Sequence, residues 1–411
     1  MEDIWKSWPE IYHLTKGYGK KVILWGRSDD WLPKIIPKLK HVKDLYIVDQ
    51  NPAYNNTYFM DIPVYLPERL EDEYKDDVYV IITGAVYDSI SHDLKKLGYK
   101  PGINYCCSPE MKDWGILQEI REYNKNIIIA CSDYKDKSKK RWSQMGGGIY
   151  TLNTRDNKLK KHIDGHFRQI INVDDFYYAI EFVEKKIYKI SKDFKVIDKY
   201  DDHFEKPNAC GIAYHPRTKT FFVANAGTDT IHIFNRSFDK VDDISISRKY
   251  EMYGDSQHHI NDICIVGDQL LISCFSISGN WKKGIMDGGI VSIDINQLHR
   301  KPEVVVQGLW MPHSIEFING NISYLDSMNG DFYITTQKIE GKFNGFIRGI
   351  AYDGRFYYIG QSEDMYTSRL FGIKDNIMCN AGVYLFDKET KVSRFYSCPF
   401  IMNVHDILIE E

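Results

Sequence analysis

Cationic and titratable side chains recur at one position of a repeated strand pattern in this 411-residue sequence. Six residues share that position: Arg168, Cys210, Asn261, His313, Arg348 and His405. Two guanidinium and two imidazole groups brought together would repel one another without a counter-charge. Arginine also presents a planar fork of donors that matches carboxylate or phosphate. The pattern therefore predicts a site for a small anionic ligand.

Histidine would add acid–base chemistry to this site. His259 lies two residues before Asn261 and is expected to join His313 and His405 as a catalytic group. A nearby arginine lowers the pKa of an imidazole, so the ring would be neutral near pH 7 and able to accept a proton. The arginines would stabilise negative charge that develops on the substrate, and Asn261 and Asp262 would orient the groups. This chemistry suits a lyase, an epimerase or a hydrolase acting on an acidic sugar or a similar metabolite.

Further side chains near the same strand ends are expected to contact the substrate. Asn208 points to the same side of its strand as Cys210, because strand side chains alternate. Trp310 offers an aromatic face for a sugar ring, while Asp326 and Gln361 end the second strands of their hairpins. The predicted substrate-binding residues are Arg168, Arg348, Asn261, Asp262, Asn208, Cys210, Trp310, Asp326 and Gln361.

Two alternatives use the same residues. A divalent metal could be held by His259, His313 and His405, although neighbouring arginines disfavour a cation there. The arginines could instead belong to a buried ion network with Asp262, Asp406 or Glu363. The basic stretch at 135–142, KDKSKKRW, is interpreted as a solvated connection between strands.

The strands that would position these residues form an internal repeat. The segment FRQIINVDDFYYAI, from Phe167, aligns without a gap with IRGIAYDGRFYYIG, from Ile347. Each is a strand, a polar turn and a second strand. Four further copies begin at residues 209, 260, 312 and 404. The last copy ends after one strand, and candidate partners lie at 126–133, 146–153 and 158–163. We therefore predict a six-bladed β-propeller of about four strands per blade, closed by the C-terminal strand.

The first part of the chain follows another pattern. Apolar strands at 20–26, 44–50 and 77–84 alternate with helical segments, which predicts a small Rossmann-like domain with a parallel sheet. The fold class is thus α/β plus all-β, with domains at 1–120 and 121–411. The segment GRSDDW, from Gly26, has one glycine where a dinucleotide site needs three, and its carboxylates would oppose a pyrophosphate. NAD binding is therefore not favoured.

Two resemblances add to these predictions. Residues 18–115, with VILWG, YIVDQNP and VIITGAVYDSISHDLKKLGYKPGINYC, resemble the small Rossmann-like domain of bacterial sugar O-acyltransferases, which in some members binds a nucleotide-linked sugar. The phrase GIAYHP…VANAGTDTIHIF resembles propellers of the gluconolactonase, strictosidine-synthase and NHL-repeat group. The segments HINDI, MPHSIEF and FIRGIAY…IGQSE resemble an uncharacterised bacterial propeller family across residues 125–411. That resemblance implies the fold and carries no reaction.

Composition excludes several other classes. Lys and Arg total 53 against 57 for Asp and Glu, giving a net charge of −4, so no basic field indicates a nucleic-acid partner. No apolar run is long enough to span a membrane, and the N-terminus lacks a secretory signal, which predicts a cytoplasmic protein. The eight cysteines form no CxxC pair and are expected to be buried free thiols. The competing function is a non-catalytic propeller that binds a glycan or a protein, with the first domain as a docking platform for a sugar nucleotide.

Overall fold

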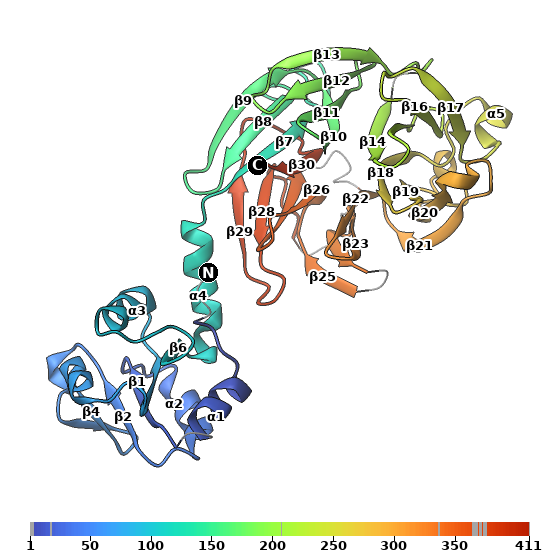
Figure 1. The fold of residues 1–411 in the computed structure, drawn as a ribbon. Coiled ribbons are helices and arrows are strands. Elements are labelled where there is room, and N and C mark those ends of the chain that lie inside the picture. Colours follow the sequence, from blue (N-terminus) through green and yellow to red (C-terminus); the bar gives the residue numbers. More distant parts are fainter. Residues whose placement is uncertain are drawn as a thin grey trace. The chain divides into compact units, whose positions relative to one another are not determined.

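The computed structural model describes residues 4–16, 19–206, 208–335, 338–363, 369, 372 and 376–410 (Figure 1). The chain divides into two compact units, Met1–Glu119 and Ile120–Glu411. The predicted fold class is confirmed: an α/β unit is followed by a six-bladed β-propeller. Among the described residues, no helix combines the length and apolarity needed to cross a bilayer.

The first unit is built on a six-stranded sheet with the order β3-β4-β2-β1-β5-β6. Five strands are parallel, and only β3 pairs in the antiparallel sense, with β4. The strands are β1 Lys21–Trp25, β2 Leu45–Val48, β3 Thr57–Phe59, β4 Ile62–Tyr65, β5 Val78–Ile82 and β6 Tyr105–Cys107. Because β5 and residues 22–25 of β1 are apolar, they can be buried on both faces, as in other parallel sheets.

Helices supply the apolar cover for this sheet. Among the described residues, the helices α1 Trp8–Lys16, α2 Leu32–Ile35, α3 Tyr87–Lys96 and α4 Lys112–Glu122 begin in the first unit, and α5 Lys249–Tyr253 belongs to the second. Alternate side chains of β1 pack into two separate clusters, with Ile23 beside α3 residues and Val22 beside α1 and α2 residues. The 3-10 helices of the first unit, among the described residues, are η1 Ile36–Leu39, η2 Pro52–Tyr54, η3 Pro67–Asp72 and η4 Pro109–Met111. Two more, η5 Trp281–Lys283 and η6 Ile295–Gln297, lie in the second unit.

The helix expected after the first strand is interrupted. It consists of α2 followed by η1, because Pro37 has no N–H to donate to the carbonyl one α-helical turn earlier. The N-cap residue of α2 is Trp31, whose backbone N–H donates a hydrogen bond to Ser28 Oγ at 3.3 Å. The helix predicted after the third strand is present as α3, and Gly98 follows it with φ +82°.

The second unit contains six four-stranded antiparallel sheets arranged as the blades of a propeller (Figure 1). Three blades are β10 Phe167–Val173, β11 Phe176–Glu181, β12 Lys186–Ser191, β13 Val196–Asp201; β14 Ala209–His215, β15 Thr220–Asn225, β16 Thr230–Phe234, β17 Lys240–Ser245; and β18 Ile260–Val266, β19 Gln269–Cys274, β20 Gly288–Asp294, β21 Glu303–Leu309. The next two are β22 Pro312–Ile318, β23 Asn321–Asp326, β24 Asp331–Ile334, β25 Lys338–Lys342; and β26 Phe346–Tyr352, β27 Tyr357–Ser362, β28 Gly382–Phe386, β29 Ser393–Ser397.

The sixth blade joins the two ends of the propeller sequence. It consists of β30 Asp406–Ile409, β7 Asn126–Cys131, β8 Gly148–Asn153 and β9 Lys158–Asp164. β30 lies antiparallel to β7, with Asp406 opposite Ala130 and Ile409 opposite Ile127. The predicted closure is therefore confirmed. It gives strand β7, the first of the N-terminal hairpin, a partner along its inner edge.

The inner strands carry irregularities at the repeat position that the sequence singled out. In five blades the register with the second strand shifts there, as between Phe167 and Ile170 in β10 and between Ile347 and Ile350 in β26. A bulge adds a residue to one strand and redirects its side chains. The irregularities thus fall at Arg168, Arg348 and their counterparts.

The residue after each repeat position connects neighbouring blades. At four blade junctions the side chain of this residue accepts a hydrogen bond from a backbone amide of a neighbouring inner strand. Asp406 Oδ2 accepts from Ile170 N at 3.0 Å, Gln169 Oε1 from Ile212 N at 2.8 Å, Asp262 Oδ2 from Ser314 N at 2.8 Å and Ser314 Oγ from Gly349 N at 2.7 Å. At the other two junctions the residue is a glycine. A Cβ on Gly211 would lie 2.5 Å from the Asn261 carbonyl, and one on Gly349 would lie 3.2 Å from Asp406 Cα. Hydrogen bonds and close backbone contact therefore hold the inner strands in place.

Candidate functional site at the propeller axis

A cavity of about 170 Å³ opens where the six inner strands begin. Nine of the twelve predicted site residues line it: Arg168, Asn208, Cys210, His259, Asn261, Asp262, His313, Arg348 and His405. The remaining lining residues are Arg141, Phe275, Phe346 and Glu363. The cavity is smaller than the usual range for drug-sized ligands, so it suits a small molecule.

Three predicted residues are outside this lining and have structural partners. Trp310 donates its backbone N–H to Asp326 Oδ1 at 2.9 Å, and Asn329 donates to the other carboxylate oxygen at 2.8 Å. Gln361 is fully buried; its Oε1 accepts from the Tyr384 hydroxyl at 2.9 Å and its Nε2 donates to the Asn380 carbonyl. The side chains of Asp326 and Gln361 thus stabilise the turns beside their strands, and the Trp310 ring packs against an apolar cluster.

Arg168 has no ion-pair partner among the residues that the structure describes. Its guanidinium lies over the ring of Phe182, 4.1 Å from the centroid, and its Nε is buried without a hydrogen bond. Burial lowers the pKa of Arg168 to about 10, so the group is still charged at pH 7. His259 Nδ1 and Asn261 Nδ2 are likewise buried without partners. Unsatisfied polar atoms at such a site call for bound water or a ligand.

Arg348 is held in position by neutral groups. Its Nη2 donates to Asn403 Oδ1 at 2.7 Å and to Ser362 Oγ at 3.1 Å. Its Nη1 lies 3.3 and 3.2 Å from the two ring nitrogens of His405. Burial and, after it, the charge of Arg348 keep the pKa of His405 well below its ordinary value. His405 is therefore neutral and packs against the guanidinium rather than standing free in the cavity.

Among the three histidines that line the cavity, His313 is the one whose tautomer follows from its hydrogen bonds. Its Nδ1 lies 2.9 Å from the Met311 carbonyl and 2.8 Å from Ser327 Oγ. A carbonyl can only accept, so Nδ1 carries the proton and Nε2 carries the lone pair. No described residue bonds Nε2. Burial and, secondarily, Arg348 keep the pKa of His313 well below its ordinary value. A neutral imidazole with a fixed tautomer and an available lone pair can accept a proton.

His259 occupies an aromatic setting. Its ring stacks on Trp281 at 4.2 Å and lies 4.5 Å from the ring of Phe275. Burial, followed by the charge of Arg168, lowers the pKa of His259 to about 3. The ring is neutral across the physiological range and acts as a hydrogen-bonding group.

Neither of the acidic residues that line the cavity, Asp262 and Glu363, forms an ion pair with Arg168. Asp262 uses Oδ2 to accept the Ser314 amide, and burial raises its pKa to about 6. Glu363 is exposed, and burial followed by the charge of Asp133 raises its pKa. The described residues contain no group of three or more His, Cys, Asp or Glu side chains placed to hold a metal ion, so His259, His313 and His405 do not form such a group.

Two lining residues were missed by the sequence analysis. Residues 136–140 of the basic stretch are exposed, as expected, but Arg141 is half-buried and lines the cavity. The interpretation of this stretch as wholly solvated was wrong for Arg141, because the loop after β7 reaches the axis through the blade that β30 closes. Phe275 directly follows β19, the kind of position from which rim residues were expected. Its ring contacts His259 and also His313, at 5.3 Å.

The cysteines fit the expectation of free thiols. Six of the eight are buried, Cys264 is half-buried and Cys379 is exposed, which departs from the prediction that all would be buried. Cys210 lines the cavity, but burial raises the pKa of its thiol to about 12. Its Sγ lies 3.4 Å from the Ala224 carbonyl. Cys210 is a packing group rather than a nucleophile.

One family model matches part of this chain. A model of a domain of unknown function, DUF4915, matches residues 246–391, which include β18–β28. No functionally curated protein matches the chain in sequence.

Several solved structures are similar in shape. They include the nidogen/laminin complex (TM-score 0.49, 10% identity, 70% of this chain and 99% of that chain) and streptogramin B lyase (0.41, 12%, 70% and 88%). A third is a candidate gluconolactonase (0.41, 10%, 58% and 80%), from the group that the sequence was expected to resemble. At these identities the likeness concerns the fold and assigns no activity.

Proposed function

We propose that the axial cavity is a catalytic site for a small anionic, sugar-related metabolite. The observation that carries this proposal is the state of His313. Its Nδ1–H is held by the Met311 carbonyl, its Nε2 lone pair has no described partner, and it lies in a cavity with three arginines. A lone pair without a protein partner is available to take a proton from a bound ligand.

Arg168 and Arg348 supply the binding energy for the anion. Arg168 has a buried Nε without a partner and no described carboxylate within ion-pair distance. A carboxylate or phosphate would provide the missing acceptor and the missing negative charge at once, since a fork of N–H donors binds both oxygens of such a group. Arg348 is already oriented by Asn403 and Ser362, so little ordering is needed when the ligand binds.

His313 acts as the general base. In the empty cavity its pKa is kept low by burial and by Arg348. A bound anion offsets the positive charge of the arginine, which raises the pKa of the imidazole and strengthens it as a base. Proton removal is thereby coupled to the presence of substrate. His405 packs on Arg348 and serves to position it, while His259 and Asn261 offer hydrogen bonds to the rest of the ligand.

The reaction class that suits these groups is removal of a proton from the carbon next to a carboxylate. The electron pair moves onto the carboxylate as an enolate, which the guanidinium groups stabilise. Loss of a leaving group from the neighbouring carbon then completes a lyase reaction, and return of the proton to the opposite face completes an epimerase reaction. A hydrolase would use the same histidine to activate water.

The first unit has a subsidiary role in this proposal. Its resemblance to the small domain of sugar O-acyltransferases favours a place for the protein in surface-glycan or related sugar metabolism. The competing possibility is a propeller that binds a glycan or a protein without turnover. That alternative places ligand contacts on the rim loops and gives His313 no chemical task.

The test uses the full-length protein and a panel of uronic acids and sugar phosphates. Exchange of the C–H proton next to the carboxylate is followed by NMR in D2O, and binding is followed by calorimetry. His313→Gln should reduce exchange or turnover about 100-fold or more while the ligand still binds. His299→Gln, a change at an exposed histidine, should leave both unchanged.

Binding itself is tested with Arg168. Arg168→Lys keeps the positive charge but removes the fork, and should weaken binding of the anion about tenfold or more. Binding that is insensitive to both Arg168→Lys and His313→Gln, with no exchange for any member of the panel, would contradict the catalytic proposal and favour the rim-binding alternative.

A further inference from the structure

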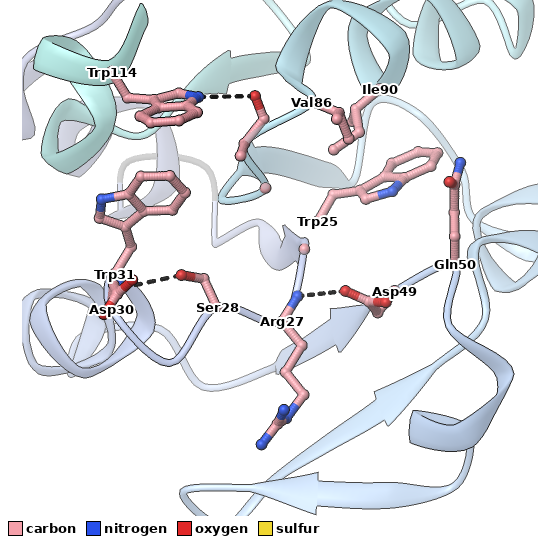
Figure 2. A pocket seen from close by; sticks show the side chains of 13 residues that line it. Trp25, Arg27, Ser28, Asp30, Trp31, Asp49, Gln50, Val86, Ile90 and Trp114 are labelled. Carbon is pink, nitrogen blue, oxygen red and sulfur yellow. Dashed lines mark hydrogen bonds between the residues drawn. The ribbon is translucent and has the colours of Figure 1, made fainter.

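The first unit contains a cavity that is larger than the cavity at the propeller axis. It has a volume of about 560 Å³ and lies at the carboxyl ends of β1, β2 and β5, where ligands of parallel α/β sheets bind (Figure 2). Gly26 and Gly84 form its floor. A Cβ on Gly26 would lie 2.5 Å from Gly84 N, and Gly26 has φ +115°, so the end of β1 requires glycine at position 26 to approach the end of β5 this closely.

Three tryptophans line this cavity from separate elements. Trp25 ends β1, Trp31 precedes α2 and Trp114 lies on α4 (Figure 2). Trp114 is oriented by its indole N–H, which donates to the Ala85 carbonyl at 3.1 Å. Trp31 and Trp114 are only half-buried, and Val86 at the edge of the cavity is 62% exposed. The rings of Trp31 and Trp114 are therefore partly accessible from the cavity and not fully packed in the hydrophobic core.

The charges of the cavity do not suit a phosphate. Within the described part of this unit, Arg27 is the one cation in the lining, and it forms an ion pair with Asp29 at 3.2 Å. Its guanidinium lies over the rings of Tyr54 and Phe59 and is directed away from Trp31, as Figure 2 shows. The other charged lining groups are the carboxylates Asp30 and Asp49. An anionic ligand would meet net repulsion here.

The arrangement of the indoles also disfavours a flat aromatic ligand. The ring planes of Trp31 and Trp114 are inclined at 60° with centroids 6.3 Å apart. Two walls at this angle form a corner and not a parallel slot into which a purine could slide. A pyranose ring needs only one aromatic face for its apolar C–H surface, and its hydroxyl groups are donors for carboxylate and amide oxygens.

We propose that this cavity is a binding site for an uncharged saccharide, with no nucleotide attached. Its sugar ring would pack on Trp31 and Trp114. Asp30, Asp49 and the Gln50 amide oxygen would accept from the hydroxyl groups. The proposal is independent of the function proposed for the propeller axis, because no lining residue is shared and the ligand has a different charge.

The test titrates the full-length protein with maltose, lactose and N-acetylglucosamine, and in parallel with UMP and UDP. Indole N–H resonances are followed by NMR. A neutral saccharide should shift the Trp31 and Trp114 signals, and either Trp31→Ala or Trp114→Ala should weaken its binding at least tenfold. Trp8→Ala is the matched control, since Trp8 is a half-buried tryptophan of the same unit outside the lining.

The wild-type spectra keep the test decisive even if a tryptophan variant fails to fold. Shifts of the Trp31 and Trp114 resonances with a neutral saccharide, and none with UMP or UDP, support the proposal. Binding of UMP or UDP without any saccharide would overturn it, as would a panel in which neither resonance moves.

Discussion

Glu316 offers a quantitative test of the electrostatics inside the propeller. It lies on β22 in a cavity of about 390 Å³ that is lined by the far ends of β10, β14 and β18. No described residue forms a hydrogen bond with its carboxyl group. Burial, with a further contribution from Asp262, raises the pKa of Glu316 from 4.5 to about 8. The ionised carboxylate is therefore disfavoured in the folded protein.

The magnitude follows from this pKa. Between pH 4.5 and 8 the folded protein keeps a proton that the unfolded chain has lost, so stability falls as the pH rises and levels off above pH 8. The ceiling is about 5 kcal/mol, at about 1.4 kcal/mol for each pKa unit. Water in the open cavity solvates part of the charge, so we expect a net cost of about 1–3 kcal/mol.

Glu316→Gln removes the ionisable group and keeps its shape. By differential scanning calorimetry of the full chain, the variant should match the wild type within about 1 kcal/mol at pH 5 and exceed it by about 1–3 kcal/mol at pH 8.5. That difference corresponds to several degrees in the melting temperature of the propeller transition. Glu251→Gln, on the exposed surface of α5, should show no such trend. A difference from wild type that is the same at both pH values would refute the reasoning.

Three further predictions use other parts of the molecule. Gly349 has φ +81°, and a Cβ there would lie 3.2 Å from the Asp406 backbone of the next inner strand, whereas Gly354 has φ +94° and open space around it. Gly349→Ala should therefore destabilise the propeller by about 2 kcal/mol more than Gly354→Ala. Calorimetry measures both variants, and equal losses of stability would contradict the packing role of Gly349. Iodoacetamide at pH 8 should label Cys379 quickly and leave Cys210 unmodified in the native protein, as peptide mass spectrometry would show; rapid labelling of Cys210 would contradict its burial. If His313 is the base, the acid limb of kcat/KM should lie well below the pH at which a free imidazole titrates, because burial and the adjacent guanidinium lower the pKa of this histidine in the free enzyme. The acid limb of kcat should lie at higher pH; limbs at the same pH would argue against coupling to the substrate.

Much of the propeller fold was predictable because the sequence pattern that forms each blade is short and recurs along the chain. Each inner strand follows the same short pattern, so the alignment of Phe167 with Ile347 located equivalent positions in different blades. Strand alternation then indicated which side chains face the same way. The incomplete final copy predicted the closure that β30 makes with β7. Nine of the twelve residues that this register singled out line the axial cavity.

Predictions failed where position depends on chain segments far apart in the sequence. Arg141 belongs to a basic loop whose composition is typical of a solvated surface, and only its blade's pairing with the C-terminal strand brings it to the axis. Trp310, Asp326 and Gln361 satisfied the pattern of rim residues, but the turns around them use their polar groups.

The sequence by itself determined the number of blades, their closure and the ring of cationic and polar side chains, because hydrophobic alternation and repeat spacing are properties of neighbouring residues. Only the tertiary structure decided the proton position on His313, the contact of Arg348 with His405, and the meeting of Trp31 with Trp114. These depend on distances of a few ångströms between side chains from different elements, which packing sets and sequence spacing does not encode.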